Sequence, residues 1–298
     1  MTLDLHTFMN KPVYLNYNQA ALDRQYNARA AVPAFDAFVK RWMADSKQAS
    51  EELSCTLDVP YGESDDEVLD IFHPARGSPA PVLMFFHGGY WRAGDKSWFS
   101  FLARPFVERG AMFVIPKYGL APRHNMDVLV NQCRRAVAWT HLHADEYGGD
   151  NARLFISGHS AGGHITGMML AADWATHGGM PADTIKGITG ISGLYDLEPI
   201  RLSHVNKPLQ LTKASVERNS PVRQPLCITP PPNLLAYGEL ESSEYGRQAA
   251  AYAAALQDAG GAPLTMGIQG HHHFSILDAF ANPEHSFGCA VLKQIGLA

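Results

Sequence analysis

The chain has 298 residues, of which 46% are hydrophobic, and it carries a formal net charge of −5 at pH 7. This is the composition of a globular protein with enough apolar side chains for a sizeable core. Because no run of basic residues occurs, the charge argues against binding to nucleic acids or anionic membrane surfaces. We expect a single domain over residues 1–298, since α/β architectures of this length are commonly undivided.

Four widely separated cysteines occur without a Cys-x-x-Cys motif: Cys55, Cys133, Cys227 and Cys289. This spacing argues against a zinc ribbon or a thioredoxin-like site, and we expect free buried thiols in a reducing compartment. The first residues show no basic region followed by an apolar one, so we expect no signal peptide. No apolar run has the length of a membrane helix. We therefore predict a cytoplasmic protein with no membrane partner, and a homodimer is compatible with the sequence.

Residues 1–50 are predicted to form a helical N-terminal extension. Phe35, Phe38, Val39 and Trp42 follow the i, i+3, i+4, i+7 spacing of an amphipathic helix. We expect these side chains to pack against the core.

From about residue 53 onward the sequence predicts strands that alternate with helices. Segments 53–59 and 68–72 alternate in polarity around an acidic turn and predict an antiparallel hairpin. Further strands are expected at 82–86, 112–115, 154–157, 186–192, 233–237 and 264–268. Helices are expected at 97–109, 127–143, 163–172, 243–259 and 286–297. Residues 198–232 contain several prolines and no clear period, which predicts a lid or cap segment over the site.

This alternation predicts an α/β fold. Its central sheet should be mostly parallel and covered by helices on both faces, with the hairpin forming an antiparallel N-terminal edge. Ligands of such sheets bind beyond the carboxyl ends of the strands. The residues that follow each predicted strand are therefore the candidates for a functional site.

Residues 158–162 read GHSAG, a match to G-x-S-x-G between a predicted strand and a predicted helix. This context is typical of a nucleophile elbow, in which a sharp turn exposes the serine hydroxyl. Ser160 is the candidate nucleophile. The alternative from this motif alone is a glycine-rich turn with a surface serine.

An acid and a histidine follow later strands, in the order Ser, acid, His that is typical of α/β-hydrolases. Glu241 lies shortly after strand 233–237, and Asp196 follows the preceding strand. Glu239 and Glu244 are also near the end of strand 233–237. Among these four candidates we favour Glu241 as the acid, with Asp196 as the second candidate. An imidazole activates a serine, and a carboxylate fixes the imidazole tautomer.

Three consecutive histidines follow the last strand, at 271–273. We choose His273 as the base, because Phe274 can anchor the loop in the core. Adjacent histidines cannot easily face one ion, so we expect no metal and no cofactor. His87, His159 and His164 are expected to support the site or pack near it.

The loop after strand 82–86 reads HGG at 87–89 and is the candidate oxyanion hole. Backbone N–H groups of Gly89 and Ala161, with Gly88 or Tyr90 as a further donor, would stabilise a tetrahedral oxyanion. Tyr90 and Trp91, together with Tyr118, are candidates for contact with an aryl group. Their alternative role is packing in the core or at the rim.

These motifs together resemble the kynurenine formamidase branch of the α/β-hydrolases. The resemblance spans about residues 17–290 and rests on QYNARAAVP at 25–33, FHGGYW at 86–91, RAGDK at 92–96, GHSAGGH at 158–164, SGLYDL at 192–197, GELES at 238–242 and His273-Phe274. HGGxW is its specific part, since the wider esterases usually carry a third glycine. Two positions depart from the family pattern. The acid is commonly Asp in the family and corresponds to Glu241 here, and the residue before the catalytic histidine is often Asp and is His272 here.

The resemblance implies hydrolysis of N-formylkynurenine to kynurenine and formate through a formyl-enzyme on Ser160, with Glu241 and His273 as acid and base. The partner would then be a small aryl amide or ester. A carboxylesterase acting on small acyl esters is the alternative function. A hydrolase fold retained for binding alone is disfavoured by the intact set of three residues.

Overall fold

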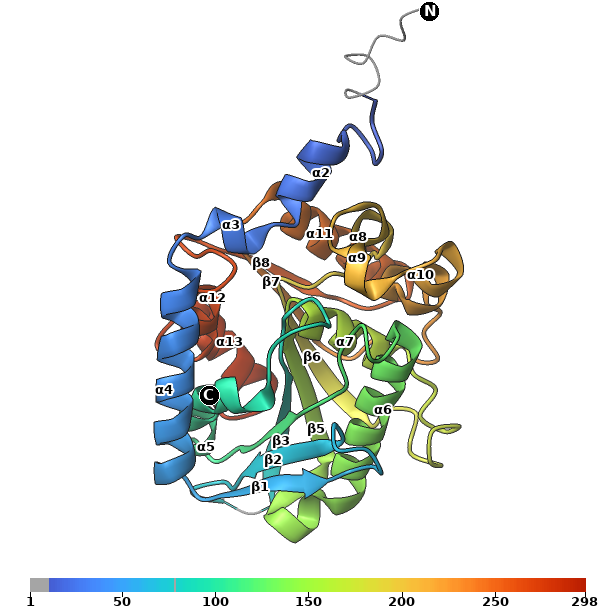
Figure 1. Ribbon diagram of the computed structural model, residues 1–298. Coiled ribbons are helices and arrows are strands. Elements are labelled where there is room, and N and C mark those ends of the chain that lie inside the picture. The colour runs from blue at the N-terminus through green and yellow to red at the C-terminus, as the bar shows by residue number, and fades with distance from the viewer. Residues whose placement is uncertain (1–10, 78) are drawn as a thin grey trace, which may run out of the picture.

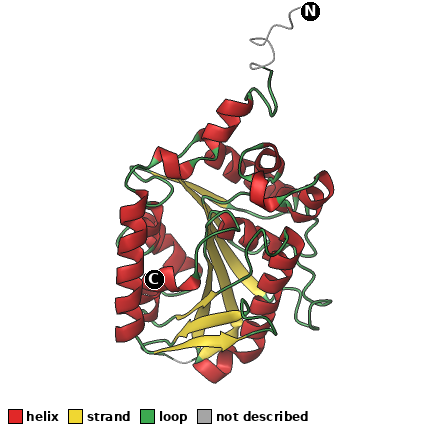
Figure 2. Ribbon diagram, viewed as in Figure 1, coloured by secondary structure: helices red, strands yellow, loops and turns green. Residues whose placement is uncertain are grey.

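A mixed eight-stranded sheet forms the centre of the molecule, in the computed structural model that describes residues 11–77 and 79–298 (Figures 1 and 2). The strand order is β1-β2-β4-β3-β5-β6-β7-β8. The strands are β1 (Cys55–Pro60), β2 (Val68–Phe72), β3 (Ala80–Phe86), β4 (Met112–Pro116), β5 (Gly149–His159), β6 (Ile185–Ile191), β7 (Asn233–Gly238) and β8 (Leu264–Ile268). Strand β2 pairs antiparallel with β1 and β4, whereas every pair from β4 to β8 is parallel. The predicted parallel sheet with an antiparallel N-terminal edge is confirmed.

Helices cover both faces of this sheet. They are α2 (Gln19–Gln25), α3 (Ala28–Ala31), α4 (Phe35–Glu52), α5 (Arg104–Val107), α6 (Met126–His143), α7 (Ala161–Leu170), α8 (Glu198–Leu202), α9 (Asn206–Leu209), α10 (Lys213–Asn219), α11 (Ser243–Asp258), α12 (Ile276–Phe280) and α13 (Ser286–Gln294). Short 3₁₀ turns are η1 (Lys96–Trp98), η2 (Ser100–Ala103), η3 (Ala144–Tyr147) and η4 (Pro221–Arg223).

The alternation of side chains along buried strand β3 divides the core in two. Val82, Met84 and Phe86 pack in one cluster with residues of α6, α7 and α11. Leu83 and Phe85 pack in the other cluster with residues of α4, α5, α12 and α13. Successive strand residues point to opposite faces, so an apolar run without alternation is what a sheet covered on both faces requires.

The N-terminal helix α4 runs along one side of the molecule (Figure 1), with Trp42 buried and Phe35, Phe38 and Val39 partly buried against the second cluster. Their expected packing against the core is confirmed. The N-terminal helices also include α2 and α3, which the spacing of apolar residues did not predict.

The predicted helix at 97–109 is wrong as a continuous element. The chain forms η1, η2 and the four-residue α5 there instead. Pro105 stands at the start of α5, where its missing N–H and ring preclude an uninterrupted α-helix through this segment. The structure also contains α12, which was not predicted.

All four cysteines are free, but they are not all buried as expected. Cys133 is buried, Cys55 and Cys289 are partly exposed, and Cys227 is exposed. Cys227 lies in the irregular connection that precedes β7, outside both core clusters. Within the described residues, no helix is long and apolar enough to cross a membrane.

Candidate active site

Ser160 occupies a strained turn between β5 and α7. Its backbone has φ 58° and ψ −115°, a conformation that residues with a Cβ rarely adopt. The turn is held by a hydrogen bond from the Ser160 N–H to the Ile191 carbonyl, at 2.8 Å. Because α7 begins at the next residue, Ser160 lies at the positive end of the helix dipole.

The glycines of the motif allow this turn to pack tightly. A Cβ on Gly158 would lie 2.3 Å from the carbonyl oxygen of Gly162, and a Cβ on Gly162 would lie 1.9 Å from that of Phe86. Both distances are far inside van der Waals contact. The two glycines therefore let the start of α7 approach the ends of β5 and β3, which fixes the position of Ser160.

A chain of hydrogen bonds links Ser160, His273 and Glu241. The Ser160 hydroxyl lies 3.0 Å from His273 Nε2, and His273 Nδ1 lies 2.5 Å from Glu241 Oε1. A carboxylate accepts, so Nδ1 carries the proton and Nε2 is free to accept from the serine. The serine and histidine are 2% and 5% exposed, and the Glu241 side chain is 1% exposed. The geometry suits proton transfer from the serine to the histidine.

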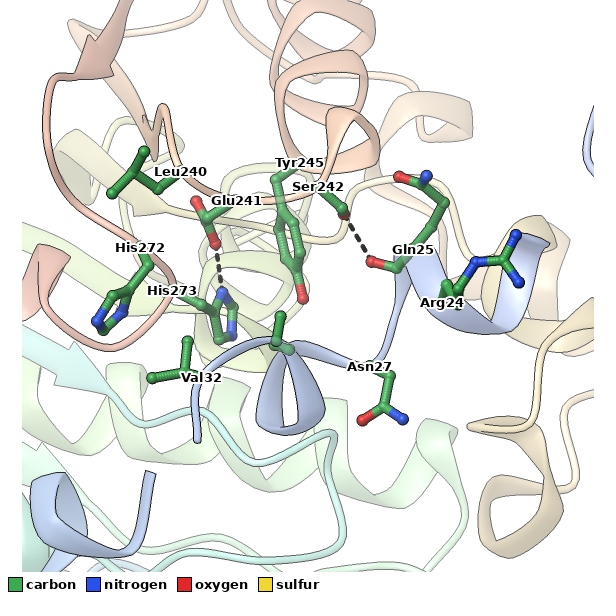
Figure 3. Close-up of a pocket in the computed structure, with 12 residues that line it drawn as sticks. Arg24, Gln25, Asn27, Val32, Leu240, Glu241, Ser242, Tyr245, His272 and His273 are labelled. Atoms are coloured by element: carbon green, nitrogen blue, oxygen red, sulfur yellow. Dashed lines mark hydrogen bonds and ion pairs between the residues drawn. The ribbon is translucent and has the colours of Figure 1, made fainter. Parts of the chain in front are cut away.

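The second oxygen of Glu241 is held by two further donors. Oε2 accepts from the Gly238 N–H at 2.6 Å and from the Ser192 hydroxyl at 2.8 Å. These bonds tie the carboxylate to the ends of β7 and β6 and leave Oε1 directed at His273, as Figure 3 shows. A buried carboxylate requires such partners, because an unpaired charge in the interior is costly.

Asp196, the second candidate acid, forms no hydrogen bond with His273. Its carboxylate accepts from the Tyr14 hydroxyl at 3.2 Å and from the Arg223 guanidinium at 3.2 Å. It also caps the turn into α8 by accepting from the Glu198 N–H. This arrangement makes Asp196 a structural acceptor.

His159 and Tyr245 both pack against the base. Their rings lie 4.6 Å and 4.7 Å from the His273 ring. His159 Nε2–H donates to the His273 carbonyl at 2.7 Å. Burial, with the neighbouring His273 as a smaller cause, lowers the pKa of His159 well below its ordinary value, so this ring stays neutral.

The HGG loop lies against Ser160. A Cβ on Gly88 would be 3.1 Å from the Ser160 Cβ, and Gly89 has φ +116°. No hydrogen bond to another described residue uses the N–H of Gly88 or Gly89. Ala161 is the first residue of α7, where the N–H has no partner within the helix. The three predicted oxyanion donors are thus adjacent to the nucleophile.

A cavity of about 430 Å³ opens at Ser160 and His273. Its apolar wall includes Trp98 and Phe99, together with Phe35, Val39 and Trp42 of α4. Tyr90 also lines the cavity, as predicted. Only His204 contributes from the 198–232 segment, so the N-terminal helices form more of the wall than the expected lid does.

Trp91 does not line the cavity, contrary to the expectation that it contacts substrate. Its side chain is 0% exposed, and its indole N–H donates to His164 Nδ1 at 3.2 Å. Tyr90 and Trp91 have φ of 50° and 55°, and this left-handed turn directs the indole into the core. Tyr118 is likewise buried, with its hydroxyl donating to the His87 carbonyl. Both residues therefore support the HGG loop.

The other histidines of the 271–273 run have local partners. His271 Nδ1–H donates to the Ser275 carbonyl, and His272 Nδ1 accepts from the N–H groups of Phe274 and Ser275. His272 lies on the far side of His273 from the Ser242 contact with Gln25 (Figure 3). Among residues 11–77 and 79–298, no group of three or more His, Cys, Asp or Glu side chains is arranged to hold a metal.

Comparison with known proteins identifies the family. A family model described as the α/β-hydrolase fold matches residues 83–276. The kynurenine formamidase of Danio rerio is 35% identical to this chain over 270 residues, which cover 87% of this chain and 88% of that protein. The chain belongs to the kynurenine formamidase branch of the α/β-hydrolases. The Salmo salar kynurenine formamidase is 32% identical over 94% of this chain and 97% of its own length.

Membership of the kynurenine formamidase branch makes this chain a hydrolase and confirms the predicted fold. A crystal structure of a protein from Silicibacter sp., which has been suggested to be a thioesterase, superposes with a TM-score of 0.79. It is 27% identical, and the match covers 90% of this chain and 97% of that one.

Two parts of the site in this chain were not predicted from its sequence. Ser192 follows β6 directly and donates to Glu241, a placement that the rule of strand ends could have indicated. The second is the link between α2 and α3. Tyr26 accepts through its carbonyl from the Tyr90 hydroxyl at 2.7 Å and lines the cavity. No local sequence pattern predicts that contact, because the two residues are 64 positions apart.

Proposed function

We propose that this hydrolase cleaves aryl formamides, with N-formylkynurenine as its substrate and kynurenine and formate as products. The observation that carries the proposal is the hydrogen-bonded chain from Ser160 through His273 to Glu241 at the base of an aromatic-lined cavity. The activity named for the Danio rerio and Salmo salar relatives supports the choice of substrate.

In the proposed mechanism, His273 Nε2 takes the proton of the Ser160 hydroxyl while Oγ attacks the formyl carbon. The N–H groups of Gly88, Gly89 and Ala161 stabilise the resulting oxyanion. Each such donor is commonly worth about a hundred- to a thousandfold in rate. The imidazolium formed on His273 is stabilised by Glu241.

His273 then donates its proton to the departing aryl amine, which leaves a formyl ester on Ser160. A water molecule next gives a proton to His273 Nε2 and attacks the ester carbonyl. Collapse of this second intermediate releases formate and returns the proton to Ser160. Every proton thus passes through one nitrogen, which is consistent with a single base beside the nucleophile.

We also propose that residues 1–298 form one domain, in which the N-terminal helices and residues 198–232 cover the site. The positions of Phe35 and His204 in the cavity wall support this arrangement. A cytoplasmic location is part of the proposal, and the four free cysteines are in keeping with a reducing compartment.

A carboxylesterase is the second candidate function, because the serine, histidine and carboxylate arrangement serves esters and amides alike. The thioesterase suggestion for the Silicibacter protein favours it. The two are separated by kcat/KM for N-formylkynurenine and for p-nitrophenyl acetate. We expect the formamide to be preferred, and a hundredfold or greater preference for the ester would refute the formamidase proposal.

A further inference from the structure

The walls of the 430 Å³ cavity carry positive but no negative side chains. Arg29 and Arg92 line it, and neither Asp nor Glu is among the described residues that do so. This contrasts with the net charge of −5 on the whole chain. A cleft lined by one sign of charge concentrates ligands of the opposite sign.

Arg92 is the member of this set whose charge is not already paired. Arg29 binds Asp36 at 2.9 Å. The Arg92 side chain is exposed and forms no hydrogen bond or ion pair with residues 11–77 or 79–298. Its five N–H donors are therefore available to a ligand in the cavity.

The backbone of Arg92 is also held in a defined place, by a tight turn after the HGG loop. The Gly89 carbonyl accepts from the N–H groups of both Arg92 and Ala93, each at 3.1 Å. The buried Trp91 fixes the preceding residue, since its carbonyl accepts from the Ala121 N–H at 2.7 Å. Arg92 thus follows the oxyanion loop by three residues on a tight turn, and it lines the same cavity as Ser160.

We propose that Arg92 binds a carboxylate on the leaving-group side of the substrate, so that this site selects aryl amides and esters whose leaving group carries a carboxylate over those that lack one. The assignment to the leaving group rests on the proposed function, because a formyl group has no atom that could carry a charge. A guanidinium matches a carboxylate through two parallel N–H donors, which favours an arginine for this task.

The test compares N-formylkynurenine with its carboxamide, in which only the carboxylate is capped. Arg92→Gln should raise KM for N-formylkynurenine about tenfold, which corresponds to about 1.4 kcal/mol. It should leave kcat, and both constants for the carboxamide, unchanged. Arg92→Lys should recover part of the loss, and the effect should weaken at high ionic strength because the side chain is exposed.

Arg76→Gln is the matched control, because Arg76 is exposed and precedes β3, at the opposite end of the strand from the HGG loop. This control removes the same charge and should change neither kcat nor KM for either substrate. The proposal is overturned if Arg92→Gln changes KM equally for the two substrates or for neither, or if Arg76→Gln reproduces the effect of Arg92→Gln.

A second pair, acetylsalicylate and phenyl acetate, separates this inference from the proposed function. If N-formylkynurenine is not cleaved but Arg92→Gln selectively impairs acetylsalicylate, the formamidase proposal fails and the role of Arg92 stands. If N-formylkynurenine is cleaved and Arg92→Gln shows no selectivity in either pair, the role of Arg92 is refuted and the formamidase proposal stands.

Discussion

Replacing Glu241 by Gln perturbs a carboxylate that accepts three hydrogen bonds. Oε2 receives the fixed Gly238 N–H and the Ser192 hydroxyl, whereas Oε1 receives His273 Nδ1–H. The glutamine oxygen should occupy the Oε2 position, since the Gly238 N–H cannot turn away. Its NH₂ group then faces Nδ1, which must become an acceptor, and the imidazole proton moves to Nε2. In that tautomer His273 cannot take the proton of Ser160.

We expect kcat to fall by about 10³–10⁴, the typical cost of the wrong tautomer in such a triad, which is about 4–5.5 kcal/mol in the barrier. The assay is steady-state hydrolysis of N-formylkynurenine, with circular dichroism melting to verify folding. Asp196→Asn is the control and should retain kcat, at a cost of no more than about 1 kcal/mol in stability. Our reasoning is refuted if Asp196→Asn abolishes turnover while Glu241→Gln retains it.

Three further predictions concern the support of the site. Gly162→Ala places a Cβ 1.9 Å from the Phe86 carbonyl oxygen and should destabilise the protein by about 1–3 kcal/mol or more. Denaturant unfolding measures this, and unchanged stability would contradict it. Trp91→Phe removes the donor to buried His164. It should cost about 1–3 kcal/mol and lower kcat, whereas wild-type values for both would show that the indole does not position the loop. Burial lowers the pKa of His164 from 6.5 to about 4. The unfolded chain therefore binds a proton below pH 6.5 that the folded chain does not, and stability should fall by about 2 kcal/mol between pH 7.5 and 5 from this group. Urea unfolding at both pH values should show a smaller loss in His164→Gln, and an equal loss would exclude His164 as the cause.

The convergence of the site residues was predictable because parallel strands end at one edge of a sheet. Ser160 follows β5 and the histidines at 271–273 follow β8, so strand positions place both at this edge. The choice of His273 among the three rested on its neighbour Phe274. The choice of acid was less determined, since Asp196 and Glu241 both follow strands on that edge. The turn after β7 brings Glu241 to His273 and lets its Oε2 accept from Ser192, after β6, and from Gly238 of β7. Only the three-dimensional structure therefore distinguishes the two candidate acids.

The cavity wall could not be predicted from local patterns. Trp91 was expected at the substrate because an aryl leaving group would suit an aromatic pocket, but its positive φ directs it inward, and neither Tyr nor Trp signals a left-handed turn. The helical spacing of Phe35, Val39 and Trp42 indicates burial without saying against what. Their place in the cavity depends on packing between segments that are distant in the sequence.

The most direct test of a formyl-enzyme on Ser160 is mass spectrometry of the peptide that contains this residue. The protein is mixed with N-formylkynurenine and quenched in acid during turnover. We predict that this peptide carries one formyl group in the wild type and none in Ser160→Ala, which should also lose turnover. Wild-type turnover by Ser160→Ala, with no formyl group on the peptide, would contradict the proposed mechanism.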